Sequence, residues 1–273
     1  MKKLFCSLML VALLLLSVEA ADKPKYIALT FDDGPSGCFT TDLLDGLAAR
    51  GVHATFFICG YRVDQFPGIT ARIAAEGHEI GVHGDTHTMF SQMSPSEVCG
   101  DLSAAMRKIE EASGVRPTLL RPPGGIYDLD VLKKTVCADL PVILWSVDVE
   151  DWHRSNSDEI CADIVKEVQN GDVILLHDMK ESSVNAALKV IDRLQSEGFV
   201  FVTVSELADL AETKLSGNTA YYGFRFAKNA SISAFDAETE PCAKLPLPPP
   251  RPRSARLSVR AKSCRSPSKQ PTA

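Results

Sequence analysis

Apolar and polar positions divide the chain into short apolar runs and longer amphipathic segments, which follow one another in alternation. The short runs read as strands and span 26–31, 54–59, 78–83, 118–123, 141–147, 172–177 and 199–204. The longer segments read as helices and span 40–51, 67–77, 94–114, 128–137, 157–171 and 184–198. Repeated strand–helix units indicate parallel strands joined by right-handed crossovers. The pattern therefore predicts an α/β fold.

The number of units limits the architecture. Six to eight such units in about 190 residues fit an irregular (β/α) barrel of the TIM type, here with seven parallel strands. An open doubly wound sheet is the alternative. In both architectures the functional residues lie at the carboxyl ends of the strands. Each candidate residue can be tested against that rule.

Two helices carry recognisable end signals. Segment 94–114 begins with Ser94, Pro95 and Glu97, the pattern of a capping box with proline at the first helical position. Segment 40–51 begins with a threonine, expected as its cap, and stops at Gly51.

The first twenty residues differ from the rest. A basic start, an apolar run and a small-x-small ending at Val18–Ala20 predict a secretory signal peptide over 1–20. An N-terminal membrane anchor is the alternative, but the apolar run is short for a span of roughly 20 residues. We therefore expect a secreted or periplasmic protein of the cell envelope, without a membrane span after cleavage.

Charge separates the body of the chain from its end. Residues 21–242 hold 19 Lys and Arg against 34 Asp and Glu, whereas residues 243–273 hold eight basic residues and no acidic one. The acidic body argues against nucleic acid as a partner. Segment 213–243 reads as an extension with an edge hairpin, and the Pro-, Arg- and Ser-rich segment 244–273 as a disordered tail. The tail is either a tether to an anionic envelope surface or an extension without a partner.

Seven cysteines follow the expected cleavage site, namely Cys38, Cys59, Cys99, Cys137, Cys161, Cys242 and Cys264. Export permits disulfides, and an odd count leaves at least one thiol free or paired between molecules. The sequence does not decide the connectivity.

Residues suited to chemistry follow several of the predicted strands. "LTFDDGP" ends with Asp32 and Asp33, "HEIGVHGDTH" with His83 and His87, and "LLRPPGG" contains Arg121. "LWSVDVEDW" ends with Asp148, Asp151 and Trp152, and "ILLHD" with His177 and Asp178. Five such coincidences at strand ends predict one site.

The residue types indicate metal-assisted hydrolysis of an amide or ester. Two histidines and one carboxylate give three protein ligands and leave a position for water. A divalent metal lowers the pKa of that water and polarises a carbonyl oxygen. A second carboxylate can then accept the proton, and a histidine across the site can protonate the leaving group. Asp32 and Asp33 would thus have different tasks.

These residues together resemble the polysaccharide deacetylases, carbohydrate esterase family 4, whose catalytic unit is the NodB homology domain. The resemblance rests on "TFDDGP", "HGDTH", "RPPGG", "DVEDW" and "LLH" in family order, and the predicted domain covers 21–212. It implies an irregular (β/α) barrel and a divalent metal, usually zinc.

The resemblance also implies a role for each matched position. Asp33, His83 and His87 would bind the metal. Asp32 would be the base, held by Arg121, and His177 the acid, oriented by Asp151. Trp152 and Leu175 would line the acetyl pocket, and Gly124 would offer its backbone N–H to the oxyanion.

Two positions depart from the family pattern. Gly84 stands where Ser or Thr usually hydrogen-bonds the loop between the metal histidines, and Gly124 stands where an aromatic side chain is usual. The substrate groove is expected to differ at Gly124.

The expected function is an exported deacetylase of N-acetylglucosamine-type glycans, either peptidoglycan or a chitin-like polymer. An O-acetyl (xylan) esterase with the same machinery is a close alternative. A non-catalytic glycan-binding wall protein and a hydrolase of a small non-sugar amide are the others.

Overall fold

The computed structural model describes residues 24–226. The predicted signal peptide, the basic tail and the extension beyond residue 226 lie outside the described residues. The strands are β1 (Lys25–Asp32), β2 (Thr55–Ile58), β3 (Glu79–Val82), β4 (Val142–Ile143), β5 (Val147–Asp148), β6 (Val173–His177), β7 (Phe199–Val202) and β8 (Ala220–Tyr221). The helices are α2 (Gly37–Arg50), α3 (Gly60–Gln65), α4 (Pro67–Ala75), α5 (Pro95–Ser113), α6 (Leu129–Thr135), α7 (Ser157–Glu167), α8 (Glu181–Ser196) and α9 (Val204–Leu210). Three short 3₁₀ turns complete them, η1 (Phe90–Gln92), η2 (Pro123–Gly125) and η3 (Asp151–His153).

The strands of the main sheet are parallel, in the order β3-β2-β1-β6-β5. Strand β7 pairs with the first half of β1, from Lys25 to Ala28. Strands β4 and β8 form a separate parallel pair, and single bridges through Leu120 join β3 to β4. The predicted α/β class with parallel strands is confirmed. Among residues 24–226 the ladder does not close into a continuous barrel, because β4 and β8 are joined to the main sheet only by single bridges, through Leu120 and between Asp172 and Gly223.

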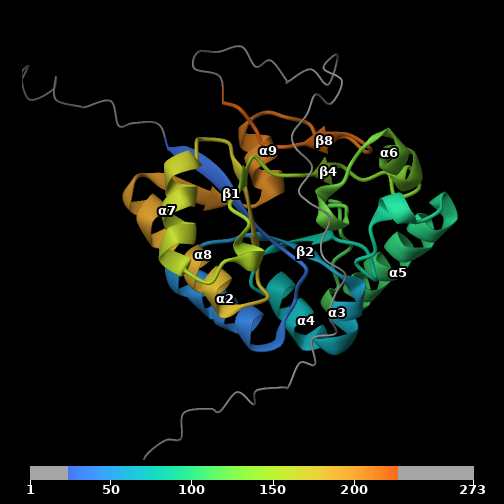
Figure 1. The fold of residues 1–273 in the computed structure, drawn as a ribbon, viewed down its shortest axis with the longest axis horizontal. Coiled ribbons are helices and arrows are strands. Elements are labelled where there is room, and N and C mark those ends of the chain that lie inside the picture. Colours follow the sequence, from blue (N-terminus) through green and yellow to red (C-terminus); the bar gives the residue numbers. More distant parts are fainter. Residues whose placement is uncertain (1–23, 227–273) are drawn as a thin grey trace, which may run out of the picture.

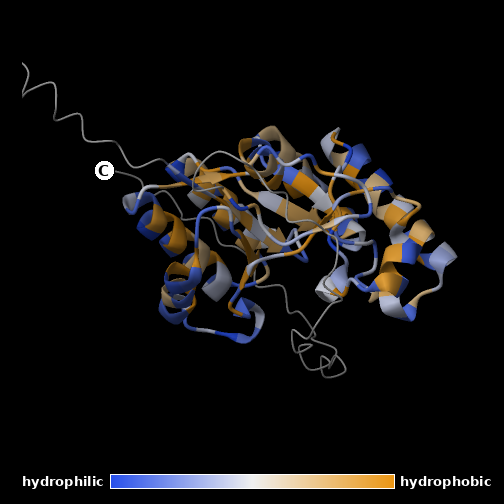
Figure 2. Cartoon of the chain, turned by 90° about the horizontal axis from the view of Figure 1, so that it is seen from above, coloured by the Kyte–Doolittle hydropathy of each residue, from blue (hydrophilic) through white to orange (hydrophobic). Residues whose placement is uncertain are grey.

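Helices cover the strands on their outer side. Figure 1 shows α2, α7 and α8 on one side of β1 and α3, α4 and α5 on the other. In Figure 2 the central strands are mostly apolar, whereas the surrounding helices mix apolar and polar residues. This distribution is the one expected when helices bury one face against a sheet. Within residues 24–226, no helix combines the length and hydropathy needed to cross a membrane.

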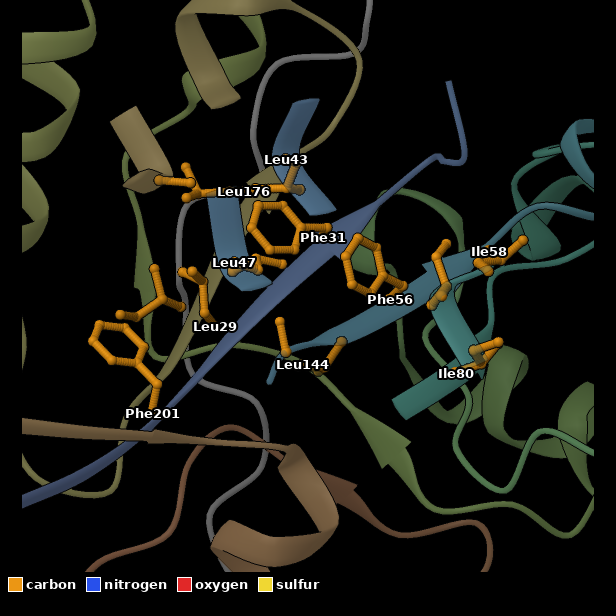
Figure 3. Packing of buried hydrophobic residues seen from close by; sticks show 14 of the residues in the cluster. Leu29, Phe31, Leu43, Leu47, Phe56, Ile58, Ile80, Leu144, Leu176 and Phe201 are labelled. Atoms are coloured by element: carbon orange, nitrogen blue, oxygen red, sulfur yellow. The ribbon is translucent and has the colours of Figure 1, made fainter. Parts of the chain in front are cut away.

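The main core lies between β1 and the helices that cover it. Leu29 and Phe31 of β1 pack with Leu43 and Leu47 of α2, as Figure 3 shows. The rings of Phe31 and Phe56 are stacked with centroids 5.2 Å apart. Each such buried side chain contributes about 1.5–3 kcal/mol through burial. The core therefore fixes β1, the strand that ends in the two aspartates.

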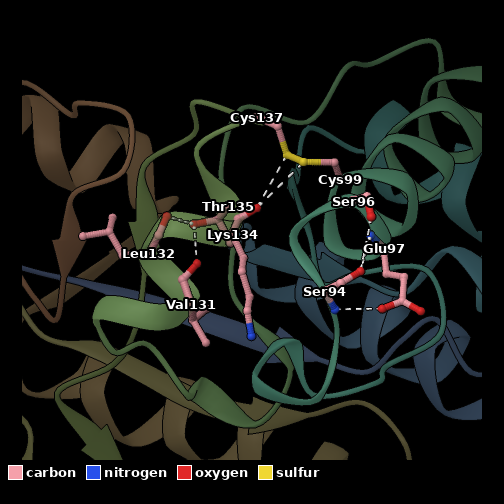
Figure 4. Close-up of a disulfide and its surroundings, with 9 residues drawn as sticks. All are labelled: Ser94, Ser96, Glu97, Cys99, Val131, Leu132, Lys134, Thr135 and Cys137. Atoms are coloured by element: carbon pink, nitrogen blue, oxygen red, sulfur yellow. Dashed lines mark hydrogen bonds between the residues drawn. A yellow bond between two sulfur atoms is a disulfide. The ribbon is translucent and has the colours of Figure 1, made fainter.

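The predicted capping box of α5 is confirmed. Glu97 N donates to Ser94 Oγ, and Ser94 N donates to Glu97 Oε2 at 2.7 Å, with Pro95 at the first helical position. Figure 4 shows this cap beside the disulfide between Cys99 and Cys137, which ties α5 to the end of the α6 segment.

The other described cysteines divide into two kinds. Cys59 and Cys161 are free thiols, and Cys38 is disulfide-bonded. The prediction of at least one free thiol holds for the described residues.

Two local predictions were wrong. Helix α2 begins at Gly37 after Ser36, so Thr40 lies inside the helix, where its hydroxyl donates to Asp178 Oδ2 instead of capping. Segment 118–123 forms only the bridge at Leu120, because Pro122 and Pro123 have no N–H for a ladder. Within 213–226, β8 pairs in parallel with β4. The predicted edge hairpin of segment 213–243 extends beyond residue 226, outside the described residues, and stays a prediction.

Candidate active site

Side chains suited to acid–base catalysis or metal binding lie at one edge of the main sheet, where the parallel strands end. Asp32 is the last residue of β1 and lies opposite His177, the last residue of β6. Phe57 of β2 flanks Asp32 on the other side, and His83 directly follows β3. The carboxyl ends of neighbouring parallel strands thus bring together residues far apart in the sequence, as the strand-end rule predicts.

Asp33 is separated from Asp32 by its backbone conformation. Its φ of 72° lies in the left-handed region, which is uncommon for a non-glycine residue. Asp33 Oδ1 lies 2.9 Å from His87 Nε2 and 3.4 Å from His83 Nε2. The two neighbouring aspartates therefore serve different partners.

The tautomer of His83 follows from its hydrogen bond. His83 Nδ1 lies 2.7 Å from the carbonyl oxygen of Arg121. A carbonyl can only accept, so Nδ1 carries the proton and donates it. In the neutral ring, His83 Nε2 then holds a lone pair and faces Asp33. This is the orientation of a metal-binding histidine whose other nitrogen is fixed by a backbone carbonyl.

Asp33, His83 and His87 fit a divalent cation. One ligand atom from each lies within 4.8 Å of the others. Asp33 Oδ1 and His87 Nε2 are buried without an aligned hydrogen bond in the described part of the chain. Burial raises the pKa of Asp33, but interactions with His83 and His87 outweigh it and hold that pKa well below its usual range. Two imidazoles and an ionised carboxylate are a zinc-type donor set with room for further ligands.

Asp32 is held from behind by Arg121. This arginine is fully buried, and its Nη1 donates to Asp32 Oδ1 at 2.7 Å and to Thr30 Oγ1 at 2.8 Å. Its Nε and Nη2 donate to the carbonyl oxygens of Ile143 and Leu144, each at 2.8 Å. Burial lowers the pKa of Arg121, while Asp32 opposes that effect.

The remaining oxygen of Asp32 faces the histidine pair. Asp32 Oδ2 lies 3.7 Å from His83 Nε2. Since Arg121 engages Oδ1 only, Oδ2 is the oxygen left for proton transfer.

His177 and Asp151 form a second buried pair. Asp151 Oδ1 lies 2.7 Å from His177 Nδ1, and its Oδ2 accepts from the backbone N–H of His177 at 3.0 Å. Burial lowers the pKa of His177, but the hydrogen bond and the charge of Asp151 outweigh it and raise this pKa to about 9. His177 is therefore protonated at neutral pH, with Nδ1 engaged and Nε2 directed elsewhere.

A hollow of about 260 Å³ lies beside these groups, lined by Asp33, Trp152, His177, Met179 and Lys180. Trp152 is 45% exposed there. A larger hollow of about 360 Å³ lies over α5 and the disulfide, and none of the predicted site residues lines it.

Two predicted substrate contacts lie apart from this lining. Leu175 is buried, two positions before His177 in β6 and hence on the same face of that strand. Gly124 lies in η2 with φ 69°, and a Cβ there would come within 2.9 Å of the end of the Met89 side chain. Neither residue lines the hollow of about 260 Å³.

The sequence patterns pointed to the strand ends but missed some neighbours. Thr30 links Arg121 to β6 by donating to the Ile174 carbonyl oxygen at 2.7 Å. Its place two residues before Asp32, on the same face of β1, was the available signal. Met179 and Lys180, which line the hollow, were also missed, although they come directly after the end of β6 and so satisfy the strand-end rule.

Known proteins resemble this chain in sequence and in fold. A family model described as polysaccharide deacetylase matches residues 19–143. A peptidoglycan-N-acetylmuramic acid deacetylase of Bacillus subtilis is 39% identical over 191 residues, which cover 70% of this chain and 40% of that protein. The chain thus spans well under half the length of that relative.

Two further matches cover nearly the whole of the protein compared. A peptidoglycan-N-acetylglucosamine deacetylase of Bacillus cereus is 37% identical over 194 residues, which cover 69% of this chain and 91% of that protein. The structure of a family 4 acetyl xylan esterase from Clostridium thermocellum, in complex with a cobalt ion, has a TM-score of 0.68 and 30% identity. That match covers 73% of this chain and 98% of the esterase chain.

Proposed function

Because the chain belongs to the polysaccharide deacetylase family, we propose that it is a metal-dependent hydrolase that removes N-acetyl groups from N-acetylglucosamine-type glycans. The predicted family is confirmed by relatives named as deacetylases. The observation that carries the proposal is the placement of three groups of side chains at one edge of the sheet: Asp33 with two histidines, Asp32 held by Arg121, and His177 held by Asp151. Metal-assisted hydrolysis of an amide uses three such groups. They are a triad suited to a cation, a carboxylate held by an arginine, and a protonated histidine.

Asp33, His83 and His87 would hold the metal, which we propose is zinc. When bound, a divalent cation supplies Lewis-acid chemistry, because it lowers the pKa of water and polarises a carbonyl oxygen. The lone pair of His83, and the buried atoms of Asp33 and His87 that lack an aligned hydrogen bond, support this assignment.

Asp32 is the proposed base. Arg121 engages its Oδ1, so the carboxylate is fixed in direction and its Oδ2 can accept a proton from water beside the triad. Thr30 and the carbonyl oxygens of Ile143 and Leu144 hold Arg121 in place.

His177 is the proposed acid. It is protonated at neutral pH and can donate from Nε2 to the departing amine nitrogen, while Asp151 keeps the ring oriented through Nδ1. Protonation of the amine completes the cleavage to acetate and the free amino sugar.

Trp152, Leu175 and Gly124 are proposed substrate contacts of different kinds. Trp152 offers a half-exposed ring at the mouth of the hollow, suited to a sugar face. Leu175 is an apolar side chain on the His177 side of β6, suited to the acetyl methyl group. The backbone N–H of Gly124 is the proposed oxyanion donor.

The chain's place is proposed to be the cell envelope, after export directed by residues 1–20. Peptidoglycan or a chitin-like polymer is the proposed partner, and the tail over 244–273 would contact an anionic envelope surface. The sequence patterns at the two ends and the activities for which the bacterial relatives are named support this proposal.

An O-acetyl xylan esterase is the second candidate, favoured by the similarity to the clostridial acetyl xylan esterase. The same groups would serve either bond, since both reactions attack an acetyl carbonyl.

The test is acetate release by purified residues 21–273 from peptidoglycan, chitin oligomers and acetylated xylan, with and without a chelator. We expect chelator-sensitive release from an N-acetylated polymer, and release at least about 100-fold slower by an Asp32→Asn variant. Release from xylan alone would replace the proposal with the esterase. Tight binding of a polymer without release from any would indicate a non-catalytic glycan-binding protein.

A further inference from the structure

The loop between His83 and His87, residues 84–86, determines where His87 meets the other two ligand residues. We propose that Asp101, on helix α5, is a positioning residue that holds this loop and so sets the affinity of the site for its metal. The inference rests on the proposed metal-dependent function. It concerns a residue that has no place in the strand-end motifs.

Asp101 accepts three hydrogen bonds from the loop. Asp85 N donates to Asp101 Oδ2 at 2.6 Å, and Thr86 N and Thr86 Oγ1 donate to Asp101 Oδ1 at 3.1 and 2.9 Å. Asp101 is only 9% exposed. A buried carboxylate bonded to two successive backbone N–H groups fixes the direction of the chain between them.

The conformation of Gly84 fits this arrangement. Gly84 has φ 75°, and a Cβ at that position would lie 2.8 Å from Asp101 Oδ2. A serine or threonine there would meet both backbone strain and the carboxylate. The loop is thus secured from α5 by Asp101, through Thr86 and two backbone amides, rather than by a side chain at position 84.

The opposite side of the loop is held by backbone contacts. Gly60 N and Tyr61 N, at the start of α3, donate to the carbonyl oxygens of Gly84 and Asp85 at 3.0 and 2.9 Å. Lys108 Nζ, also on α5, lies 2.8 Å from Asp85 Oδ1. Helix α3 therefore fixes the carbonyl groups of the loop, and Asp101 fixes its backbone N–H groups.

The consequence falls on His87. Its φ of 59° is unfavourable for a residue with a side chain and persists only where the surroundings impose it. Asp101 binds the backbone of the two residues that precede His87. In this conformation His87 Nε2 lies 2.9 Å from Asp33 Oδ1. Without Asp101 the loop amides turn to water, and His87 is no longer held ready for the metal.

The test compares zinc affinity of the full chain and its Asp101→Ala variant by competition with a chelating dye. We expect about 10-fold to 100-fold weaker binding, the range for losing a partner that orients a metal ligand. Asp101→Asn retains one acceptor oxygen and should recover part of the affinity. Thr86→Val removes the hydroxyl hydrogen bonds to Asp101 and Thr88 but keeps both backbone bonds to Asp101, so it should weaken binding less. This variant keeps the test usable if Asp101→Ala fails to fold.

Leu102→Ala is the matched control. Leu102 is the next residue of α5, is buried in the core and makes no loop hydrogen bond among those described. It should lower the midpoint of urea unfolding without changing zinc affinity. The visible absorption of the cobalt-loaded chain gives a second readout, which should change in Asp101→Ala and stay as in the parent chain in Leu102→Ala.

The outcomes separate this inference from the proposed function. Unchanged zinc affinity and cobalt absorption in folded Asp101→Ala would overturn the inference alone. Equal losses of affinity in Asp101→Ala and folded Leu102→Ala would overturn it too, since a general loss of stability would then explain both. Zinc binding without acetate release by the parent chain would sink the proposed function alone, and a parent chain without zinc binding would sink both.

Discussion

The two halves of the site differ in how completely their polar atoms are satisfied. In the metal half (Asp33, His83 and His87), Asp33 and His87 have positive φ and present buried atoms without aligned hydrogen bonds. In the acid half (His177 and Asp151), both oxygens of Asp151 engage His177, one at the ring and one at the backbone. The polar atoms of Asp151 in the acid half thus have hydrogen-bond partners within the protein. The metal half instead presents ligand atoms that a bound cation would satisfy.

This difference predicts that the halves fail in different ways. Changes in the metal half should alter metal binding first and activity as a consequence. Changes in the acid half should leave the metal in place and alter proton transfer. The following variants test that division, in order of decreasing effect.

The largest effect is expected for the His83→Ala, His87→Ala double variant. It removes two of the three metal-half side chains, so zinc affinity should fall by more than about 100-fold, beyond the loss caused by removing only a supporting partner. Acetate release should fall to background. Equilibrium dialysis with metal analysis measures the stoichiometry, and one zinc still bound per chain would refute the assignment.

Asp32→Asn should separate the two functions. The variant keeps the metal half but loses the base, so kcat should fall by about 10²-fold to 10⁴-fold while one zinc remains bound. The change also leaves the buried Arg121 without its anion, which costs about 3–5 kcal/mol of stability. Kinetics are therefore measured well below the unfolding midpoint, and simultaneous loss of zinc would contradict the division.

Asp151→Asn should move the basic limb of the pH–rate profile to lower pH. Burial lowers the pKa of His177, but the hydrogen bond and charge of Asp151, together with the charges of Asp33 and Asp32, raise it to about 9 from an ordinary value of 6.5. The Asp151 carboxylate therefore stabilises the protonated ring. The stabilisation is present below about pH 6.5 and is lost as pH rises through about 9.

Removal of the Asp151 charge therefore depletes the acid form at pH 8 much more than at pH 6. We expect about a tenfold loss of kcat at pH 8 beyond the loss at pH 6, with zinc affinity unchanged. A basic limb at the same pH in both proteins would show that His177 is not the acid.

The smallest effect is expected for Trp152→Ala. Loss of an exposed ring at the mouth of the hollow should raise KM about 2-fold to 10-fold, with kcat and zinc affinity nearly unchanged. Val200→Ala is the control, since Val200 is also half-exposed but lies on β7, beside the opposite end of β1. An equal rise of KM in both variants would remove Trp152 from the substrate contacts.

Much of the fold and of the site's location could be predicted from sequence periodicity. Parallel strands put their carboxyl ends at one edge, so Asp32, His83 and His177 were placed together before any contact was known. The capping box of α5 was also readable, because its interactions are local in sequence. Both successes depend on short-range patterns and on one general rule of topology.

The failures involve contacts between distant segments. Thr40 resembled a helix cap, but its hydroxyl binds Asp178, which lies 138 positions away. Asp101 looked like an ordinary polar helix residue, although it lies within the buried stripe of Val98, Leu102 and Ala105. A carboxylate in an apolar stripe was a signal that something must satisfy it, but its partner in the loop could not be deduced from spacing.

Strand β1 pairs with β2, with β6 and, along its first half, with β7. Thr30 and Ile174, which are hydrogen-bonded, lie 144 positions apart. Strand β1, the first of the described strands along the chain, therefore acquires these neighbours only after β6 and β7 have been synthesised. Such non-local pairing predicts slow folding. A nascent chain that ends before β6 carries Asp32, Asp33 and both metal-half histidines, but one side of β1 has no partner strand and His177 is missing. The strand that completes the pairing of β1 on that side therefore also brings the proposed acid.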